Sequence, residues 1–319
     1  MTGISSNILI KGFKRIRLLP LVAVFFIPMT GFAQKKITEE ASPDRVELKY
    51  KQRHSRQTPN SNLYADGIKI KRDLSILKEI QEELFVAVTC DDQPKDILIV
   101  VKDQLKYIQN CVESIKRNTN NYQLYIWDNG SKEETKDYLN SLDAHVYRSE
   151  ENLGFIIPNN KLISYSTSPY VILLNSDTEV KTSWDKAMIG WLQKYPDVAQ
   201  VGYCGSKLNQ DLHGGEIGFG YDVDYISGWA FCIKRETYLK YGLFDEQNLK
   251  LAYCEDSDFS LRLKEDGNKI YALYSDLVIH YENRTISEIH KNEEMTKIFK
   301  EAFSSNHEYL KKRWLQFLQ

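Results

Sequence analysis

The sequence predicts an α/β protein with a mostly parallel central sheet and helices on both faces. Three observations predict this class. Short apolar runs rich in β-branched residues alternate with segments whose apolar residues recur at helical spacing. Several of these runs end abruptly in polar residues, as strands do at the ligand-binding edge of such sheets. Finally, 42% of the residues are apolar and 27% are charged, which excludes a wholly disordered chain, a collagen-like chain and a polytopic membrane protein.

The predicted elements follow one another from residue 73. Asp73 is placed to cap a helix whose apolar positions, from Ile76 to Phe85, lie three and four residues apart. The run DILIVV at 96–101 is predicted to be a fully buried strand. Further strands are predicted at 123–131, 145–149, 170–177, near 229–234 and near 269–279. Further helices are predicted at 107–115, 132–142, 184–194 and 256–266.

The N-terminal segment has the pattern of a targeting sequence. Residues 1–17 carry basic side chains and no acid, and the uncharged stretch from Leu18 to Ala33 is shorter than the ~20 residues of a spanning helix. Small residues near position 33 complete the pattern of a secretory signal peptide cut after Ala33. The alternatives are an uncleaved signal-anchor and an extension that packs elsewhere or stays loose. We expect membrane association through residues 18–33, with a cytoplasmic chain or export after cleavage near Ala33 as the alternatives.

The chain is expected to have four parts. These are a signal peptide or anchor at 1–34, a basic linker and helix at 35–94, a catalytic domain at 95–286 and a C-terminal helical extension at 287–319. The net charge is −2, so no overall field attracts nucleic acid, and an anionic ligand must be held by a local site. The five cysteines show no CxxC spacing and are interpreted mostly as buried thiols.

Polar side chains end three of the predicted strands. They are Lys102 and Asp103 after the first, Asp128 and Asn129 after the second, and Asn175 and Asp177 after the fourth. Carboxyl ends of parallel strands meet at one edge, so these groups predict one polar crevice. No GxGxxG follows the first strand, which argues against a dinucleotide-binding fold.

Two acidic motifs are candidates for chemistry. Asp177, with Asn175 two residues before it, offers oxygen ligands on one strand face, which Mg²⁺ or Mn²⁺ would bind together with substrate phosphates. The alternative is an Asx turn at a strand end. Glu255 and Asp256 begin a predicted helix, where acids favour the helix dipole. The functional alternative is that one of them is a general base, with a pKa raised by its neighbour.

Three other features are ambiguous on sequence alone. His280 closes a strand and is either a structural residue or a ligand. His213-Gly214-Gly215 is interpreted as a loop that closes on a substrate, or as a simple turn, which makes Gly215 a candidate substrate contact. Gly228 and Trp229 would bring backbone and an aromatic face close to a ligand, although a tryptophan at a strand start is usually core.

Together these segments resemble a family 2 glycosyltransferase with the GT-A fold, a Rossmann-like single catalytic domain. The resemblance covers about Asp96 to Thr285. It is carried, in the family's order, by ILIVVKDQLKYIQNCVESI, IWDNGS, ENLGFIIPNN, LLNSDTEV and an acceptor half with SGWAFCIKRETYLKYGLFDEQ, CEDSDFSLRLKEDG and LVIHYENRT. The Asn-x-Asp-Thr-Glu form and the two glycines at 214–215 are most similar to rhamnosyltransferase-like members.

The resemblance implies an inverting transfer of a sugar from a nucleotide-diphosphate sugar to an acceptor hydroxyl of a glycan or glycoconjugate, as in polysaccharide biosynthesis. It implies that Asp128 contacts the base or ribose, that Asp177 binds a divalent metal and that Asp256 deprotonates the acceptor. His280 would add a metal or phosphate contact. The donor site would further include Lys102, Asp103, Asn129, Asn152, Gly154 and Asn160.

Two departures from the family pattern stand out. Lys102-Asp103 replaces an aromatic residue followed by Asn, and Asn175 replaces an Asp in the metal-binding triplet. Two other functions compete with glycosyl transfer. A nucleotidyltransferase would want a Gly-rich basic loop near the first strand, which DILIVVKDQLK lacks. A catalytically inactive domain that binds glycans or nucleotide-sugars need not keep Asp128, Asp177 and the Glu255–Asp256 pair together.

Overall fold

The computed structural model describes residues 36–38, 47–49, 74–281 and 293–317, and the chain forms two compact units, 1–73 and 74–319. In the first unit, β1 (Lys36–Thr38) and β2 (Glu47–Lys49) form an antiparallel pair. The expected targeting segment lies outside the described residues. Within the described part of the chain, no helix is both long enough and apolar enough to cross a membrane.

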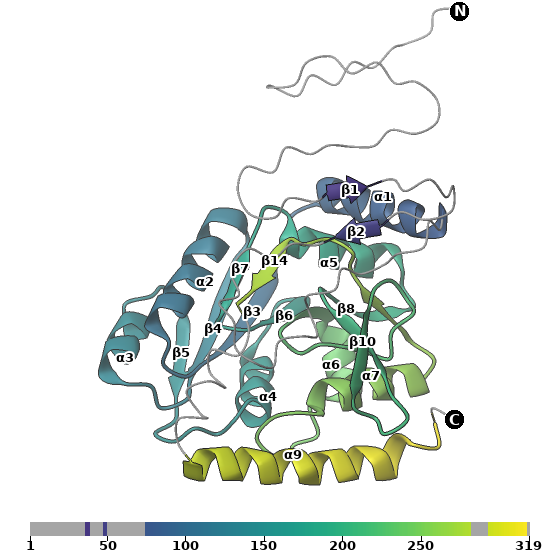
Figure 1. Cartoon of the computed structure of the whole chain (residues 1–319). Helices are drawn as coiled ribbons and strands as arrows, with labels where there is room; N and C mark the ends of the chain where they lie inside the picture. The colour runs from purple at the N-terminus through teal and green to yellow at the C-terminus, as the bar shows by residue number, and fades with distance from the viewer. Residues whose placement is uncertain (1–35, 39–46, 50–73, 282–292, 318–319) are drawn as a thin grey trace, which may run out of the picture. The chain divides into compact units, whose positions relative to one another are not determined.

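The second unit is built on a seven-stranded sheet with the order β13-β8-β12-β6-β3-β4-β5 (Figure 1). Its strands are β3 (Lys95–Val101), β4 (Tyr122–Asp128), β5 (His145–Arg148), β6 (Tyr170–Leu174), β8 (Val198–Gly202), β12 (Ala230–Lys234) and β13 (Lys269–Ala272). Neighbouring strands are parallel except at β12, which is antiparallel to both β6 and β8. The predicted mostly parallel sheet is therefore confirmed.

Alternation along β3 divides the core into two layers. Ile97, Ile99 and Val101 face one layer, and Leu98 faces the other, because successive strand side chains point to opposite faces. The first layer packs against α1 (Leu74–Thr89), α2 (Leu105–Asn118), α3 (Glu133–Asn140) and α5 (Trp184–Lys194). The second packs against α4 (Ile156–Tyr165), α6 (Arg235–Tyr241) and α7 (Glu255–Glu265).

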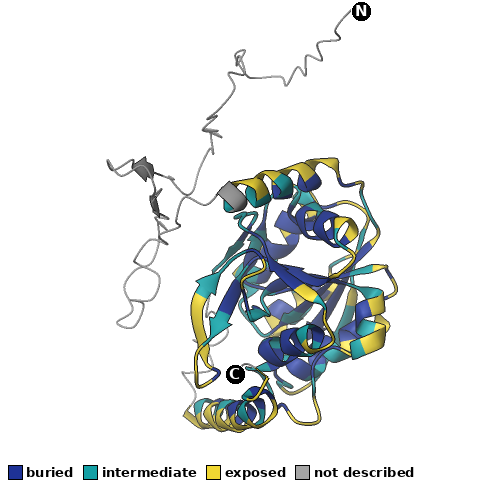
Figure 2. Ribbon diagram, turned by 90° about the vertical axis from the view of Figure 1, so that its right-hand side faces the viewer, coloured by how far each residue is buried: buried dark blue, intermediate teal, exposed yellow. Residues whose placement is uncertain are grey.

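Smaller elements surround this sheet. Strands β9 (Gly205–Leu208), β10 (Gly214–Gly218) and β11 (Tyr225–Ile226) form a three-stranded antiparallel sheet, and β7 (Thr178–Val180) pairs with β14 (Val278–His280). Helix α9 (Glu293–Trp314) follows the last strand. Figure 2 shows that α9 buries one side and exposes the other.

Three sequence expectations need correction. The strand predicted near 269–279 is two strands, because β13 pairs with β8 whereas β14 pairs with β7 in another sheet. The prediction of a loop at His213-Gly214-Gly215 is wrong for the two glycines, because they are the first residues of β10. Helix α4 escaped prediction because Pro158 lies inside it, but this is the first turn, where a proline costs no intrahelical hydrogen bond. The cysteines are free, and Cys90, Cys111 and Cys232 are buried as predicted.

Candidate active site

The carboxyl ends of β3 and β4 are tied together by hydrogen bonds. The two strands pair in register with Val101 opposite Asp128, and Asn129 N–H donates to the Val101 carbonyl at 2.8 Å. Asp103 N–H donates to Ser131 Oγ at 2.7 Å, and the Lys102 ammonium donates to the Gly130 carbonyl. The predicted convergence of these two strand ends is therefore confirmed.

Asp128 is buried and has partners for both carboxylate oxygens. Its Oδ1 accepts a hydrogen bond from Ser131 N–H at 2.8 Å, and its Oδ2 pairs with the Arg148 guanidinium. Arg148 also donates to the Ser131 carbonyl at 3.1 Å, so it fixes both the carboxylate and the turn that follows it. Sequence reasoning missed Arg148, because nothing in the segment HVYRS shows that β5 lies beside β4.

Asn129, Asn152 and Gly154 lie together beside this turn. Asn129 Nδ2 donates to the Gly154 carbonyl at 2.7 Å, and Asn152 Oδ1 accepts from Gly154 N–H at 2.9 Å. Gly154 has φ +81°, and a Cβ there would lie 2.4 Å from the Leu251 carbonyl oxygen, so only glycine fits. Asn160 instead holds a loop through the Phe244 backbone, accepting from its N–H at 3.0 Å and donating to its carbonyl at 2.9 Å.

The three predicted metal ligands converge on one point. Asp177 Oδ1 lies 3.1 Å from His280 Nε2, and the Asn175 side-chain nitrogen lies 3.4 Å from the same atom. Pairing of β7 with β14 places His280 opposite Thr178, which brings together residues about a hundred positions apart. No cluster of three His, Cys, Asp or Glu side chains suited to a metal occurs in the described ranges.

Trp229 and Gly228 connect this point to the acidic pair. The Trp229 ring stacks on His280 with centroids 4.9 Å apart, and its carbonyl accepts from Asn175 N–H at 2.8 Å. Gly228 N–H donates to Asp256 Oδ2 at 3.1 Å. A continuous series of contacts therefore runs from Asp177 to Asp256. Gly215 lies on β10, where a Cβ added to it would lie 3.0 Å from the Lys207 carbonyl oxygen of β9.

Glu255 and Asp256 occupy different environments at the start of α7. Glu255 is buried, its Oε2 has no hydrogen-bond partner, and burial together with the neighbouring Asp256 charge raises its pKa from 4.5 to about 8. Burial also raises the pKa of Asp256, but this carboxylate accepts N–H groups from Ser257 at 2.7 Å and from Gly228. Because these donors favour the ionised form, the geometry puts the shared proton on Glu255 and the charge on Asp256.

The loop before α7 has an unfavourable backbone conformation. Leu251, Tyr253 and Cys254 have φ values of 56°, 77° and 68°, in the left-handed region. Fully buried Asn306 on α9 holds this loop: it accepts from Lys250 N–H at 2.8 Å and donates to the Tyr253 carbonyl at 3.0 Å, among other contacts. The sequence did contain a signal for Asn306, since it is a polar residue on the apolar stripe of α9.

Replacement of Asn306 by Ala is expected to destabilise the second unit by about 2–4 kcal/mol. The change leaves partly buried backbone groups of the loop without partners and creates a small cavity in place of the buried Asn306 side chain. Urea denaturation measures the loss, with exposed Ser305→Ala on the same helix as the control. Equal stability of the two variants would show that Asn306 does not hold the loop.

The pKa of Glu255 predicts a pH-dependent stability. A carboxyl whose pKa rises from 4.5 to about 8 on folding stabilises the folded state below about pH 4.5, and this stabilisation is lost as the pH rises through 8. Glu255→Gln cannot lose that proton. Relative to wild type, the variant should gain stability between pH 5 and pH 8, by about 3–4 kcal/mol at most. A constant difference in unfolding free energy across this range would contradict the assignment.

Comparison with known proteins finds one family model and several solved structures that are similar to this chain. Residues 96–248 match the family model "Glycosyl transferase family 2". No curated protein matches the chain. Among solved structures, GalNAc-T7 with UDP, GalNAc and Mn²⁺ superposes with a TM-score of 0.50 and 13% identity over 63% of this chain and 51% of that one. The chain thus spans about half the length of GalNAc-T7.

Two other solved structures are also similar. A mannosyltransferase, PcManGT from Pyrobaculum calidifontis in complex with GDP-Man and Mn²⁺, gives a TM-score of 0.47 and 13% identity, covering 67% of this chain and 68% of that one. S. aureus TarS 1-349 in complex with UDP-GlcNAc gives a TM-score of 0.45 and 16% identity, covering 58% of this chain and 57% of that one. The likeness to GalNAc-T7 confirms the predicted GT-A type of α/β fold.

Proposed function

We propose that the chain is a family 2 glycosyltransferase that moves a sugar from a nucleotide-diphosphate sugar to an acceptor hydroxyl with inversion. One observation carries this proposal: a continuous series of contacts links the Asp177–His280 pair to Asp256, within a GT-A fold. The match of residues 96–248 to the family model supports the same reaction class.

The donor would lie along the ends of β3, β4 and β6. Asp128, with Asn129 and Gly154 beside it, would line the nucleotide end. Asp177, His280 and Asn175 would hold Mn²⁺ or Mg²⁺ through the Asp177 carboxylate, the His280 imidazole and, after rotation of its amide, the oxygen of Asn175, which turns its nitrogen toward His280 in this structure. When bound, the ion would neutralise charge on the diphosphate leaving group. GalNAc-T7, which shares the fold, was solved with UDP and Mn²⁺.

The acceptor would be activated by Asp256. Its carboxylate takes the proton of the acceptor hydroxyl as that oxygen bonds to the anomeric carbon and the bond from this carbon to the diphosphate oxygen breaks. A single displacement from the face opposite the leaving group inverts the anomeric configuration. Protonated Glu255 keeps a second negative charge away from this site.

A screen of nucleotide-sugars for nucleotide release, with and without Mn²⁺ or Mg²⁺, tests the proposal. A glycosyltransferase releases the nucleoside diphosphate from at least one donor in the presence of acceptor or water. Release of pyrophosphate from a nucleoside triphosphate would identify a nucleotidyltransferase instead. Binding of nucleotide-sugars without release from any donor would identify an inactive binding domain.

We further propose a membrane-associated enzyme of polysaccharide biosynthesis, of the rhamnosyltransferase-like kind, anchored through residues 18–33. The basic residues before this apolar stretch support the anchor. Cell fractionation with protease protection tests it. A soluble full-length chain in the cytosol would contradict the anchor, and a mature N-terminus at Gln34 would indicate cleavage and export.

A further inference from the structure

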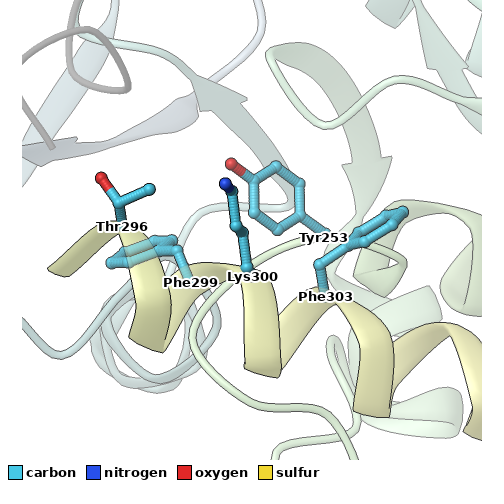
Figure 3. A pocket seen from close by; sticks show the side chains of 5 residues that line it. All are labelled: Tyr253, Thr296, Phe299, Lys300 and Phe303. Atoms are coloured by element: carbon cyan, nitrogen blue, oxygen red, sulfur yellow. The ribbon is translucent and has the colours of Figure 1, made fainter. Parts of the chain in front are cut away.

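We propose that an open pocket between α9 and the loop before α7 binds a sugar ring of the acceptor. The pocket has a volume of about 300 Å³ and is lined by Tyr253, Thr296, Phe299, Lys300 and Phe303. Figure 3 shows the four α9 side chains on the side of the helix that faces Tyr253. This inference rests on the proposed function, because it concerns the acceptor of that same reaction.

The pocket is close to the proposed base. Tyr253 lies three residues before Asp256, so their Cα atoms are at most about 11 Å apart even in a fully extended chain. The Tyr253 backbone is fixed by its left-handed conformation and by the 3.0 Å hydrogen bond from Asn306. The pocket and the proposed base therefore belong to the same short stretch of chain, within the length of a short glycan.

The aromatic rings that line the pocket meet nearly at right angles. The Tyr253 ring contacts Phe299 and Phe303 edge-on, at interplanar angles of 85° and 89°. Phe303 stacks in turn on His307, whose ring centroid lies 3.7 Å from that of His213. The histidine of the His213-Gly214-Gly215 motif thus supports the wall of the pocket. Pre-ordered aromatic surfaces of this kind bind ligands at low entropic cost.

The polarity of the pocket favours a carbohydrate. A sugar ring presents an apolar C–H face to aromatic walls and hydroxyl groups at its rim. Lys300 is exposed at this pocket, and no salt bridge between it and an acid is found in the described part of the chain. Its ammonium can donate hydrogen bonds to sugar hydroxyls or to a carboxylate, which a purely apolar ligand does not offer.

Saturation-transfer NMR of the full chain with the methyl glycosides of glucose, galactose, rhamnose and glucuronic acid tests the proposal. At least one glycoside should contact the wild type through its ring C–H protons. Phe303→Leu, which keeps an apolar side chain but removes the aromatic face, and Lys300→Gln should each weaken that contact at least fivefold. The matched controls on α9 are Lys297→Gln and exposed Ile298→Ala, which should bind as wild type does.

Three results would contradict the proposal that the pocket binds a sugar. They are no contact of any glycoside with the wild type, equal glycoside binding by the pocket variants and the wild type, or a loss of binding in the control variants as large as in the pocket variants. Hydrolysis of the nucleotide-sugar donor by water distinguishes a failure of the pocket proposal from a failure of the proposed function. All variants should release nucleotide from the donor to water at the wild-type rate. If wild type releases none from any donor, the proposed function fails, whatever the glycosides do.

Discussion

Asp256→Asn is expected to slow sugar transfer by ~10²–10⁴-fold with donor binding retained, the range that a positioned general base contributes. The variant keeps the shape of the side chain and an acceptor for one of the two N–H groups, of Gly228 or Ser257, but it cannot take the acceptor proton. Because burial raises the pKa of Asp256, wild-type activity should also fall on the acid side at a pH above the usual range of an aspartate. Initial rates with a saturating donor, together with donor affinity, measure both effects.

Two further variants make the Asp256 test specific. Glu255→Gln should be mild at neutral pH, because Glu255 already carries a proton there. Asp266→Asn, at the exposed far end of α7, is the matched control and should leave transfer unchanged. If Glu255→Gln is crippling and Asp256→Asn is mild, the roles of the two acids are exchanged. If neither slows transfer, the pair only stabilises the helix start.

Asp177→Ala is expected to remove most donor turnover, by about 10²–10³-fold, because it deletes a carboxylate at the point where leaving-group charge would be neutralised. The fold should survive, since the backbone carbonyl of Asp177, between β6 and β7, still accepts the hydrogen bond from Tyr281 N–H in the variant. Nucleotide release titrated with Mn²⁺ measures the loss, and thermal unfolding measures the stability. Asp222→Ala, which changes a highly exposed acid, is the control.

A second variant tests the metal hypothesis in the opposite direction, by adding a possible metal ligand. Asn175→Asp restores a second carboxylate beside His280 and should lower the Mn²⁺ concentration needed for half-maximal turnover. Full activity of Asp177→Ala, or full wild-type activity in EDTA, would remove the metal from the reaction.

The strand ends were predictable from sequence, and their partners were not. Asp128 and Asp177 each follow an apolar strand, a local pattern that locates them at the carboxyl edge of a parallel sheet. The contacts of Arg148 and Asn306 depend on which distant segments meet: a local pattern marks Asn306 as a polar residue on the apolar stripe of α9, but it does not give the partner of either residue. The division between β13 and β14 was missed for the same reason, since the two strands differ only in their pairing partners.

The reversed direction of β12 makes the sheet modular. Strands β3, β4, β5 and β6 form one parallel block from residues 95–174, and β8 and β13 form a second block from later in the chain, with β12 as the seam between them. Asp128 and Asn129 lie at the end of the first block, Gly228 lies just before β12, and Asp256 follows it. Residues in contact across the seam, such as Asn175 and Trp229, are expected to be coupled, whereas substitutions more than about 7–10 Å apart with no shared partner usually act independently. Sequence change away from the seam can therefore alter one block without altering the other, a route by which one scaffold diversifies its products.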